Sequence, residues 1–194
     1  MQPPRLILAS SSPFRRELLS RLHLPFDSMS PNIDETRLAG ESPIDYVQRL
    51  AMEKARVIAR EHPDAIVIGS DQCAYLDGDI LGKPGSHENA MKQLQQARGK
   101  EVVFYTGLSV QQMGSEFIRV DCVEFRVGFR HLSDTQLSHY LEVEQPYGCA
   151  GSFKSEGYGI TLFSYLSGDD PSALIGLPLI RLIGMLEDCG IEVV

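Results

Sequence analysis

The sequence predicts an α/β fold built on a mixed β-sheet, and three features of the chain carry this prediction. Apolar strand-like runs alternate with segments of helical periodicity along the chain. Asp77-Gly78 and Met113-Gly114 separate strand-like runs, as hairpin turns do. Because hairpins join antiparallel strands, the sheet cannot be purely parallel. The 194 residues, of which 43% are hydrophobic, suit a single domain over 1–194 with a packed core.

Serine residues mark the starts of most expected helices, because a serine side chain can accept a hydrogen bond from a first-turn N–H. Ser12 and Ser42 are each followed by proline, and Ser133 with Gln136 forms a capping box. Short apolar runs bounded by turn residues mark the strands. In chain order, we expect a strand over 5–8, helices over 12–22 and 42–61, a strand over 65–69 with a hairpin turn at 77–78, a helix over 86–97, strands over 102–110 and 117–129, a helix over 133–143, a glycine-rich segment over 148–159, and a helix from 178 to about 190.

Composition and charge exclude several classes of function. The net charge of −8 argues against binding to nucleic-acid polymers, which need a basic face, but it permits a small anionic ligand. No apolar run approaches the roughly 20 residues that span a bilayer, and the N-terminus makes a poor signal peptide. The four cysteines are scattered, which favours free thiols over a zinc site or disulfides. We therefore expect a cytoplasmic protein that does not act at a membrane.

The segment 8–16 has the character of a phosphate site. An apolar strand is followed by hydroxyls, Ser10 and Ser12 among them, and then by a helix start that carries Arg15. Helix N-termini attract anions, serine hydroxyls donate hydrogen bonds, and arginine binds phosphate oxygens in a bidentate fork. The segment has no Walker A spacing. The alternative for each residue taken alone is an ordinary serine cap with solvated arginines.

Two acidic positions are candidates for metal binding or proton transfer. Asp71 follows the apolar strand 65–69, at the place where open α/β sheets bind ligands. Asp34 and Glu35 are adjacent carboxylates in an expected loop, and such oxygens suit a hard cation such as Mg²⁺. A turn or capping aspartate and solvated loop charges remain the alternatives.

Two lysines and one loop complete the candidate set. Lys54 lies on the apolar stripe of the helix 42–61, so its ammonium either reaches solvent or points into a cleft lined with anions. Lys83 stands on a turn between Gly82 and Pro84, where it could bind phosphate or simply be solvated. The glycine-rich segment 148–159 permits close backbone approach to a ligand, and its Glu156 could accept hydrogen bonds from a base edge. A flexible surface loop is the alternative for this segment.

Taken together, these strings resemble the Maf family of nucleotide pyrophosphatases over almost the whole chain. The family opening L-A-S-x-S-P-R-R-x-E-L-L matches residues 8–19 except at Phe14. The other matching strings, in order, are Asp34-Glu35, Glu53-Lys54-Ala55, Asp71, Gly82-Lys83-Pro84, Tyr105-Thr106-Gly107, Ala150-Gly151 and Gly176-Leu177-Pro178-Leu179. The resemblance implies an elongated mixed sheet flanked by helices, with a deep central cleft between two lobes. It also implies a cytoplasmic homodimer that binds a nucleotide, uses a divalent metal, Mg²⁺ or Mn²⁺, and cleaves between the α and β phosphates.

Three departures from the family pattern concern the base of the substrate. Members acting on dTTP and UTP usually carry Arg, Thr and Gln where this chain has Phe14, Gln72 and Glu156. This changed set is similar to the subfamily that acts on 7-methyl-GTP. Methylation at N7 makes guanine cationic, and a cationic base favours an aromatic face and a nearby carboxylate. Phe14 could supply the face and Glu156 the carboxylate, with Phe14 as an ordinary core residue the alternative.

The resemblance implies a division of roles within one site. Asp71 is expected to accept the proton of the attacking water and, with Glu35, to hold the metal. The triphosphate is expected to bind Arg15, Lys54 and Lys83, with Ser10 and Ser12 at the helix end. Two alternatives stay open: a pyrophosphatase for another nucleotide such as dTTP or UTP, and a non-catalytic nucleotide sensor that regulates septum formation in cell division.

Overall fold

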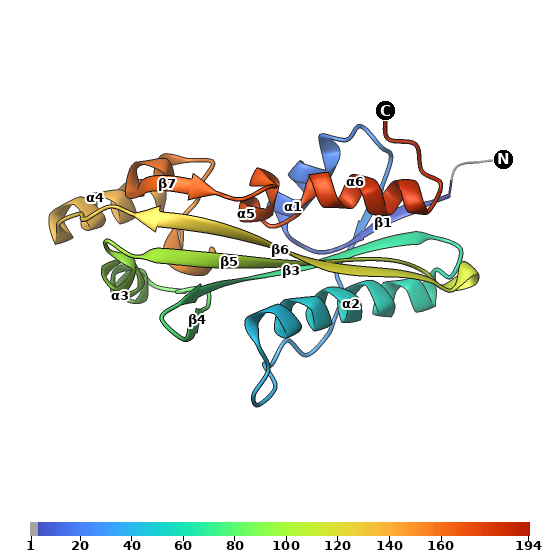
Figure 1. The fold of residues 1–194 in the computed structure, drawn as a ribbon, viewed down its shortest axis with the longest axis horizontal. Coiled ribbons are helices and arrows are strands. Elements are labelled where there is room, and N and C mark those ends of the chain that lie inside the picture. The colour runs from blue at the N-terminus through green and yellow to red at the C-terminus, as the bar shows by residue number, and fades with distance from the viewer. Residues whose placement is uncertain (1–3) are drawn as a thin grey trace. The chain divides into compact units, whose positions relative to one another are not determined.

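The computed structural model describes residues 4–194 and contains a seven-stranded mixed sheet (Figure 1). The strand order is β2-β1-β3-β5-β6-β7, and β4 pairs with β3 beside this path. β1 is parallel to β2 and β3, whereas the β3–β4 and β6–β7 pairs are antiparallel, so the prediction of a mixed sheet is confirmed. The strands are β1 (Leu6–Ala9), β2 (Asp27–Met29), β3 (Ile66–Leu76), β4 (Asp79–Leu81), β5 (Glu101–Gln112), β6 (Phe117–Phe129) and β7 (Phe163–Ser167).

Serine caps the N-terminus of each of the first four α-helices, as predicted. Ser12, Ser42, Ser86 and Ser133 each accept a hydrogen bond from a first-turn backbone N–H, and Ser133 with Gln136 completes the capping box. The α-helices are α1 (Pro13–Ser20), α2 (Pro43–Glu61), α3 (His87–Ala97), α4 (Asp134–Glu144), α5 (Pro171–Ile175) and α6 (Leu179–Asp188). The 3₁₀ turns are η1 (Met113–Ser115), η2 (Ala150–Ser152) and η3 (Tyr158–Leu162).

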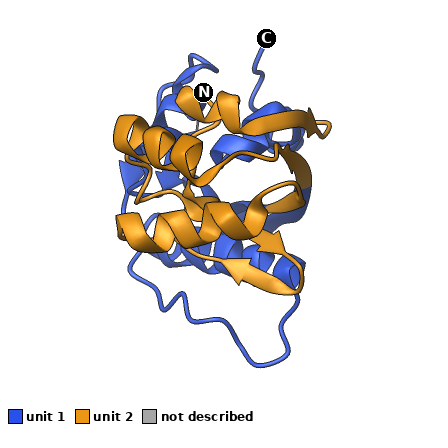
Figure 2. Cartoon of the chain, turned by 90° about the vertical axis from the view of Figure 1, so that its left-hand side faces the viewer, with its two compact units in different colours: residues 1–71, 106–123, 170–194 blue, residues 72–105, 124–169 orange. Residues whose placement is uncertain are grey.

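The chain divides into two compact units, which Figure 2 colours separately. Unit 1 comprises residues 1–71, 106–123 and 170–194, and unit 2 comprises residues 72–105 and 124–169. Each of the strands β3, β5 and β6 has residues in unit 1 and residues in unit 2. The two units therefore share these three strands. The cleft that the family resemblance implies stays a prediction.

Unit 1 has an apolar layer on each face of its part of the sheet, because alternate residues of β1 and β3 point to opposite sides. Leu6, Leu8 and Ile68 pack on one side with residues of α1 and α6. Ile7 and Val67 pack on the other side with residues of α2. Unit 1 is therefore a sheet between two helical layers, as the ribbon of Figure 1 shows for α2 and α6.

Unit 2 is stabilised by aromatic side chains that meet edge to face. Phe153 lies 5.3 Å from Phe104, 5.7 Å from Phe129 and 4.8 Å from Phe163, measured between ring centroids. Phe153 belongs to the glycine-rich segment and is buried. The reading of that segment as a flexible surface loop is therefore wrong, because its aromatic side chain is part of the core of unit 2.

Several boundaries differ from the sequence prediction. The strand expected over 65–69 extends to Leu76, so Asp71 lies within β3 and not at its end. Single-sequence patterns detect short elements poorly, and β2, β7 and α5 were not predicted. Among the described residues, none of the helices has the length and apolar character needed to cross a membrane.

Candidate active site

The centre of the candidate site in unit 1 is the ammonium of Lys54, which contacts two carboxylates. Its Nζ lies 2.6 Å from Oδ1 of Asp71 and 2.7 Å from Oε1 of Glu35. The Lys54 side chain is only 7% exposed and that of Asp71 only 11%. Of the two alternatives that the helical pattern left open, the buried and paired lysine is the one found.

Two glycines explain how α2 can bring Lys54 so close to Asp71. A Cβ on Gly69 would lie 2.1 Å from the carbonyl oxygen of Ala51, so only glycine lets the α2 backbone approach β3. On β5, a Cβ on Gly107 would similarly lie 2.2 Å from an α2 carbonyl oxygen. Since residues i and i+2 of a strand share one face, Asp71 points to the side on which Gly69 contacts the helix. Lys54, almost one turn after Ala51, then meets its carboxylate.

Glu35 reaches Lys54 from a loop that α2 holds in place. The hydroxyl of Tyr46 donates to the Glu35 carbonyl oxygen at 3.0 Å. Arg49 donates to the Thr36 carbonyl oxygen at 3.1 Å and to both carboxylate oxygens of Glu41, at 2.6 and 3.0 Å. These hydrogen bonds hold the loop to α2 at residues 35–36 and again at residue 41. Sequence analysis missed Arg49 and Glu41, because a loop that folds back on the helix that follows it leaves no periodic pattern.

The neighbouring acid, Asp34, has a local partner instead. Its Oδ1 accepts a hydrogen bond of 2.9 Å from the backbone N–H of Thr36. Hydrogen bonding to the Thr36 side chain, and secondly to this N–H, lowers the pKa of Asp34. Only Glu35 of the two adjacent carboxylates is thus paired with Lys54. Of the two acids inferred from the sequence, Glu35 belongs to the candidate site, whereas Asp34 belongs to a local turn.

Arg15 adds a second cation to the same group. It lies in the first turn of α1, and its Nε donates to the carbonyl oxygen of Gly176 at 2.8 Å. Burial lowers the pKa of Arg15, while the nearby charges of Asp71 and Glu35 oppose that shift. The two cations and two carboxylates of unit 1 therefore form one electrostatic group, Arg15, Lys54, Glu35 and Asp71.

The hydroxyls of Ser10 and Ser12 stand at the start of α1, as the sequence indicated. Ser10 Oγ accepts from the backbone N–H of Ser12 at 3.1 Å, and Ser12 Oγ accepts from that of Arg15 at 3.4 Å. Within the described part of the chain, no acceptor takes the hydrogen of either hydroxyl, so both can donate to an anion. Phe14, between Ser12 and Arg15, is half-buried.

Unit 2 contains the remaining predicted residues, which are Gln72, Lys83 and Glu156. Gln72 is the first residue of this unit and follows Asp71 directly in β3. Lys83 is exposed on a turn whose carbonyl oxygens on either side are held by α3. Gln93 donates to the Gly82 carbonyl oxygen at 3.1 Å, and Asn89 donates to that of Pro84 at 3.0 Å. The turn is thereby rigid although the lysine itself is free to meet a ligand.

Lys83 and Glu156 share one neighbourhood within unit 2. Burial raises the pKa of the Cys149 thiol, and the charges that act on this thiol include those of Lys154, Glu156, Glu144 and Lys83. These four side chains come from three separate segments, and the charge of each acts on the same thiol. Whether Lys83 and Glu156 act together with the group in unit 1 stays a prediction.

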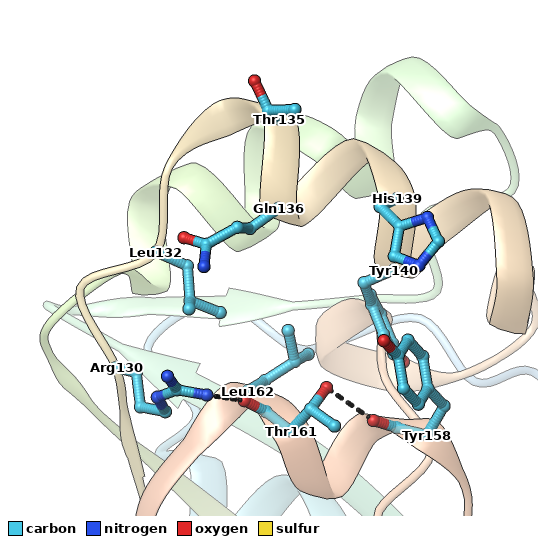
Figure 3. A pocket seen from close by; sticks show the side chains of 9 residues that line it. All are labelled: Arg130, Leu132, Thr135, Gln136, His139, Tyr140, Tyr158, Thr161 and Leu162. Atoms are coloured by element: carbon cyan, nitrogen blue, oxygen red, sulfur yellow. Dashed lines mark hydrogen bonds between the residues drawn. The ribbon is translucent and has the colours of Figure 1, made fainter.

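A separate pocket of about 400 Å³ lies in unit 2 (Figure 3). Leu132 and Leu162 provide its apolar part, and Arg130, His139 and Tyr158 contribute polar or aromatic groups. None of the ten residues that the sequence singled out for the site is among those lining it. The pocket is therefore no substitute for the charged group of unit 1 as the candidate active site.

The donor set of unit 1 fits a metal that arrives with a phosphate ligand. Glu35 and Asp71 offer hard carboxylate oxygens close to one another around Lys54. Within residues 4–194, no cluster of three or more His, Cys, Asp or Glu side chains could hold a metal by itself. Mg²⁺ is commonly bound by one or two carboxylates together with substrate phosphates and water, so the residues fit this ion.

Comparisons with known proteins agree along nearly the whole chain. Residues 5–189 match the family model described as Maf-like protein. The chain is 54% identical to a protein of Pseudomonas aeruginosa named 7-methyl-GTP pyrophosphatase, over 98% of this chain and 99% of that relative. Relatives of the same name from Methylobacillus flagellatus and Nitrosococcus oceani are 55% and 54% identical, over 98% of this chain and 100% and 96% of theirs.

Proposed function

Because this chain belongs to the Maf family, we propose that it is a hydrolase that converts 7-methyl-GTP to 7-methyl-GMP and diphosphate. The relatives that are more than half identical to it bear the name of that activity. The observation that carries the proposal is the contact of the buried Lys54 with the buried Asp71 and the exposed Glu35, next to Arg15. Such a group of charges beside a helix start suits phosphate chemistry.

Charge balance within the group favours a divalent metal as cofactor. Arg15 and Lys54 together offset Glu35 and Asp71, so the four side chains leave no surplus positive charge for a triphosphate. Mg²⁺ or Mn²⁺ held by Glu35 and Asp71 would neutralise phosphate charge. Lys83 would add a further cation from its rigid turn. Ser10 and Ser12 would donate hydrogen bonds to phosphate oxygens at the start of α1.

Asp71 is the residue best suited to orient the attacking water and accept its proton. It is buried, and its one carboxylate oxygen in contact with Lys54 leaves the other for the metal or for water. Attack on the α phosphorus releases diphosphate, and the nearby cations stabilise the charge that develops on the leaving group. Positioning and electrostatics account for this chemistry without a covalent intermediate.

Selection of the methylated base is assigned to Phe14, Gln72 and Glu156. Glu156 is exposed and can accept from the N1 and N2 hydrogens of guanine while it offsets the positive charge of the base. Phe14 is half-buried and offers an aromatic face. The enzyme is further proposed to act as a homodimer in the cytoplasm, where its four free cysteines would stay reduced.

A substrate screen with purified protein tests the proposed function. Release of diphosphate from 7-methyl-GTP, GTP, dTTP and UTP would be measured with Mg²⁺, with Mn²⁺ and with excess chelator. We expect 7-methyl-GTP to be preferred, the chelator to stop turnover, and Asp71→Asn to abolish it while the fold is kept. A preference for dTTP or UTP would support the alternative substrate class. Tight nucleotide binding without any diphosphate release would instead support a non-catalytic sensor.

A further inference from the structure

Within unit 2, the segment that carries Glu156 is held at both ends by one carboxylate, that of Glu144 at the end of α4. Glu144 Oε1 lies 3.1 Å from the ammonium of Lys154. Its Oε2 accepts a hydrogen bond of 2.7 Å from the backbone N–H of Tyr158. Lys154 stands two residues before Glu156 and Tyr158 two residues after it. The carboxylate of Glu144 therefore fixes both ends of the segment 154–158.

Neighbouring residues make room for this contact and reinforce it. A Cβ on Gly157 would lie 2.7 Å from Glu144 Oε2, so a glycine is needed for the carboxylate to reach the backbone. The hydroxyl of Tyr140 accepts from the backbone N–H of Lys154 at 3.3 Å. The ring of Tyr158 is stacked on that of Tyr140, with centroids 6.1 Å apart, as Figure 3 shows. The segment is thus fixed at its backbone while Glu156 stays exposed.

The burial of the Glu144–Lys154 pair makes its geometry stable. The side chain of Glu144 is 14% exposed and that of Lys154 is 28% exposed. Displacing either side chain would leave a charge that is partly removed from water without its partner, which is unfavourable. The segment 154–158 therefore has one strongly preferred position.

The Glu144–Lys154 pair also determines which carboxylate the positive charge of Lys154 neutralises. Lys154 and Glu156 are two residues apart, and both act electrostatically on the Cys149 thiol, so they share one neighbourhood. Since Glu144 contacts Lys154, the positive charge of this lysine is already balanced. Without the Glu144 carboxylate, the ammonium would keep its 3.3 Å hydrogen bond to the backbone carbonyl oxygen of residue 144 but would have no negative charge beside it, and it could pair with the carboxylate of Glu156. Glu156 would then be less available to a cationic base.

We infer that Glu144 and Lys154 are positioning residues for base selectivity, which hold the carboxylate of Glu156 in place and keep it from pairing with the Lys154 ammonium. In the structure this carboxylate accepts a hydrogen bond from the neutral hydroxyl of Ser155, at 3.2 Å. This inference rests on the proposed function. Sites that read a base edge through hydrogen bonds lose discrimination when the reading group moves by a fraction of an ångström. Neither residue needs to touch the reacting phosphates, so the rate of the chemical step should depend little on them.

The first test compares base selectivity among variants of α4. The selectivity is the ratio of kcat/KM for 7-methyl-GTP to that for GTP. In Glu144→Ala we expect this ratio to fall about tenfold or more, mainly through KM for the methylated substrate, with kcat within about threefold of wild type. Glu142→Ala is the matched control, because Glu142 is exposed on the same helix and bonds only within it. Its ratio should stay within about twofold of wild type.

A second comparison separates placement from charge pairing. Lys154→Met removes the ammonium but leaves Glu144 to bind the Tyr158 N–H, so selectivity should fall less than in Glu144→Ala. The double variant Glu144→Ala with Lys154→Met should recover part of the lost selectivity, since no ammonium remains to pair with Glu156. No recovery would mean that placement of the segment, and not charge pairing, carries the whole effect of Glu144.

Amide hydrogen exchange at Tyr158 tests the contact without reference to catalysis. In wild type the N–H is bonded to Glu144, and Glu144→Ala should accelerate its exchange by about tenfold or more, whereas Glu142→Ala should not. Unchanged exchange, or faster exchange with unchanged base selectivity, would overturn the inference while the proposed function stands. If wild type prefers a different nucleotide, the proposed function fails. The inference then survives only if Glu144→Ala lowers the preference for that nucleotide over the next best.

Discussion

The ammonium of Lys54 and the carboxylate of Asp71 form an ion pair of 2.6 Å in which both side chains are almost fully buried. Such a pair is costly to break from one side, because the remaining charge is largely removed from water and has lost its nearest partner. Lys54→Met keeps the length and apolar stem of the side chain but removes the charge. We expect the free energy of unfolding, measured in urea, to fall by about 3 kcal/mol, and kcat/KM to fall by orders of magnitude.

The double variant Lys54→Met with Asp71→Asn is the control for this prediction. It removes both charges, so most of the lost stability should return while activity stays absent. If Lys54→Met and the double variant were equally unstable, packing of the lysine stem and not the buried charge would be responsible.

The contact between Arg49 and Glu41 predicts a pH dependence of stability. The bonds from Arg49 lower the pKa of Glu41 below its ordinary value of 4.5. Since the folded-state pKa lies below that of the unfolded chain, the stabilisation is present above pH 4.5 and is lost as the pH falls through the folded value. The stability difference between wild type and Glu41→Gln should therefore be largest near neutral pH and shrink below pH 4.5.

Urea unfolding at a series of pH values measures this difference. Glu61→Gln, at the exposed end of α2, serves as the control and should change stability little at any of these pH values. A Glu41→Gln difference that stays constant into the acid range would contradict the prediction. The loop that presents Glu35 would then be held by something other than the charge of Glu41.

The local features of this fold could be read from the sequence, whereas its long-range contacts could not. Serine caps and the strand at β3 follow from spacing and residue type alone. The stripe on α2 placed Lys54 on the apolar face and left open whether its ammonium reaches solvent, because a periodic pattern gives a face and not a partner. Gly69 two residues before Asp71 was an available signal, because a glycine within an apolar strand indicates a close backbone approach. The contacts of Arg49 with Glu41 and of Glu144 with Tyr158 depend on how a loop folds back on a helix, which no periodic pattern records.

Substitution of Gly69 by alanine should lower the stability of the protein, whereas the control substitution, at Gly184, should raise it. In Gly69→Ala the new Cβ would meet backbone atoms of α2, at 2.1 Å from the Ala51 oxygen, so the helix must move away from β3. We expect stability to fall by about 3 kcal/mol and activity to fall with it, because Lys54 moves with the helix. Gly184 lies inside α6 with no atom within 4 Å of a new Cβ. There, alanine should stabilise the protein by about 0.5–1 kcal/mol. Thermal unfolding measures both, and a neutral Gly69→Ala would show that α2 tolerates displacement.

Asp170 makes a buried connection that sequence analysis did not identify. Its Oδ1 accepts from the backbone N–H of Ser172 at 3.1 Å, which caps α5. Its Oδ2 accepts from the backbone N–H of Ile180 at 2.8 Å, and so satisfies a first-turn donor of α6, whose own cap residue, Pro178, has no side-chain acceptor. The Asp170 carboxylate therefore accepts hydrogen bonds at the N-termini of two consecutive helices, α5 and α6, and so fixes the turn that carries Gly176.

Asp170→Ala should therefore destabilise unit 1 and loosen the group around Arg15, whose Nε bonds the Gly176 carbonyl. Charge-assisted bonds to backbone N–H groups contribute more than neutral ones, and two partly buried donors lose their acceptor, so we expect a loss of about 2–3 kcal/mol. Asp169→Ala is the matched control, because Asp169 is the exposed neighbour and should change stability by less than about 0.5 kcal/mol. Urea unfolding measures both values. Equal and small losses would show that water can replace the Asp170 carboxylate at the two helix starts.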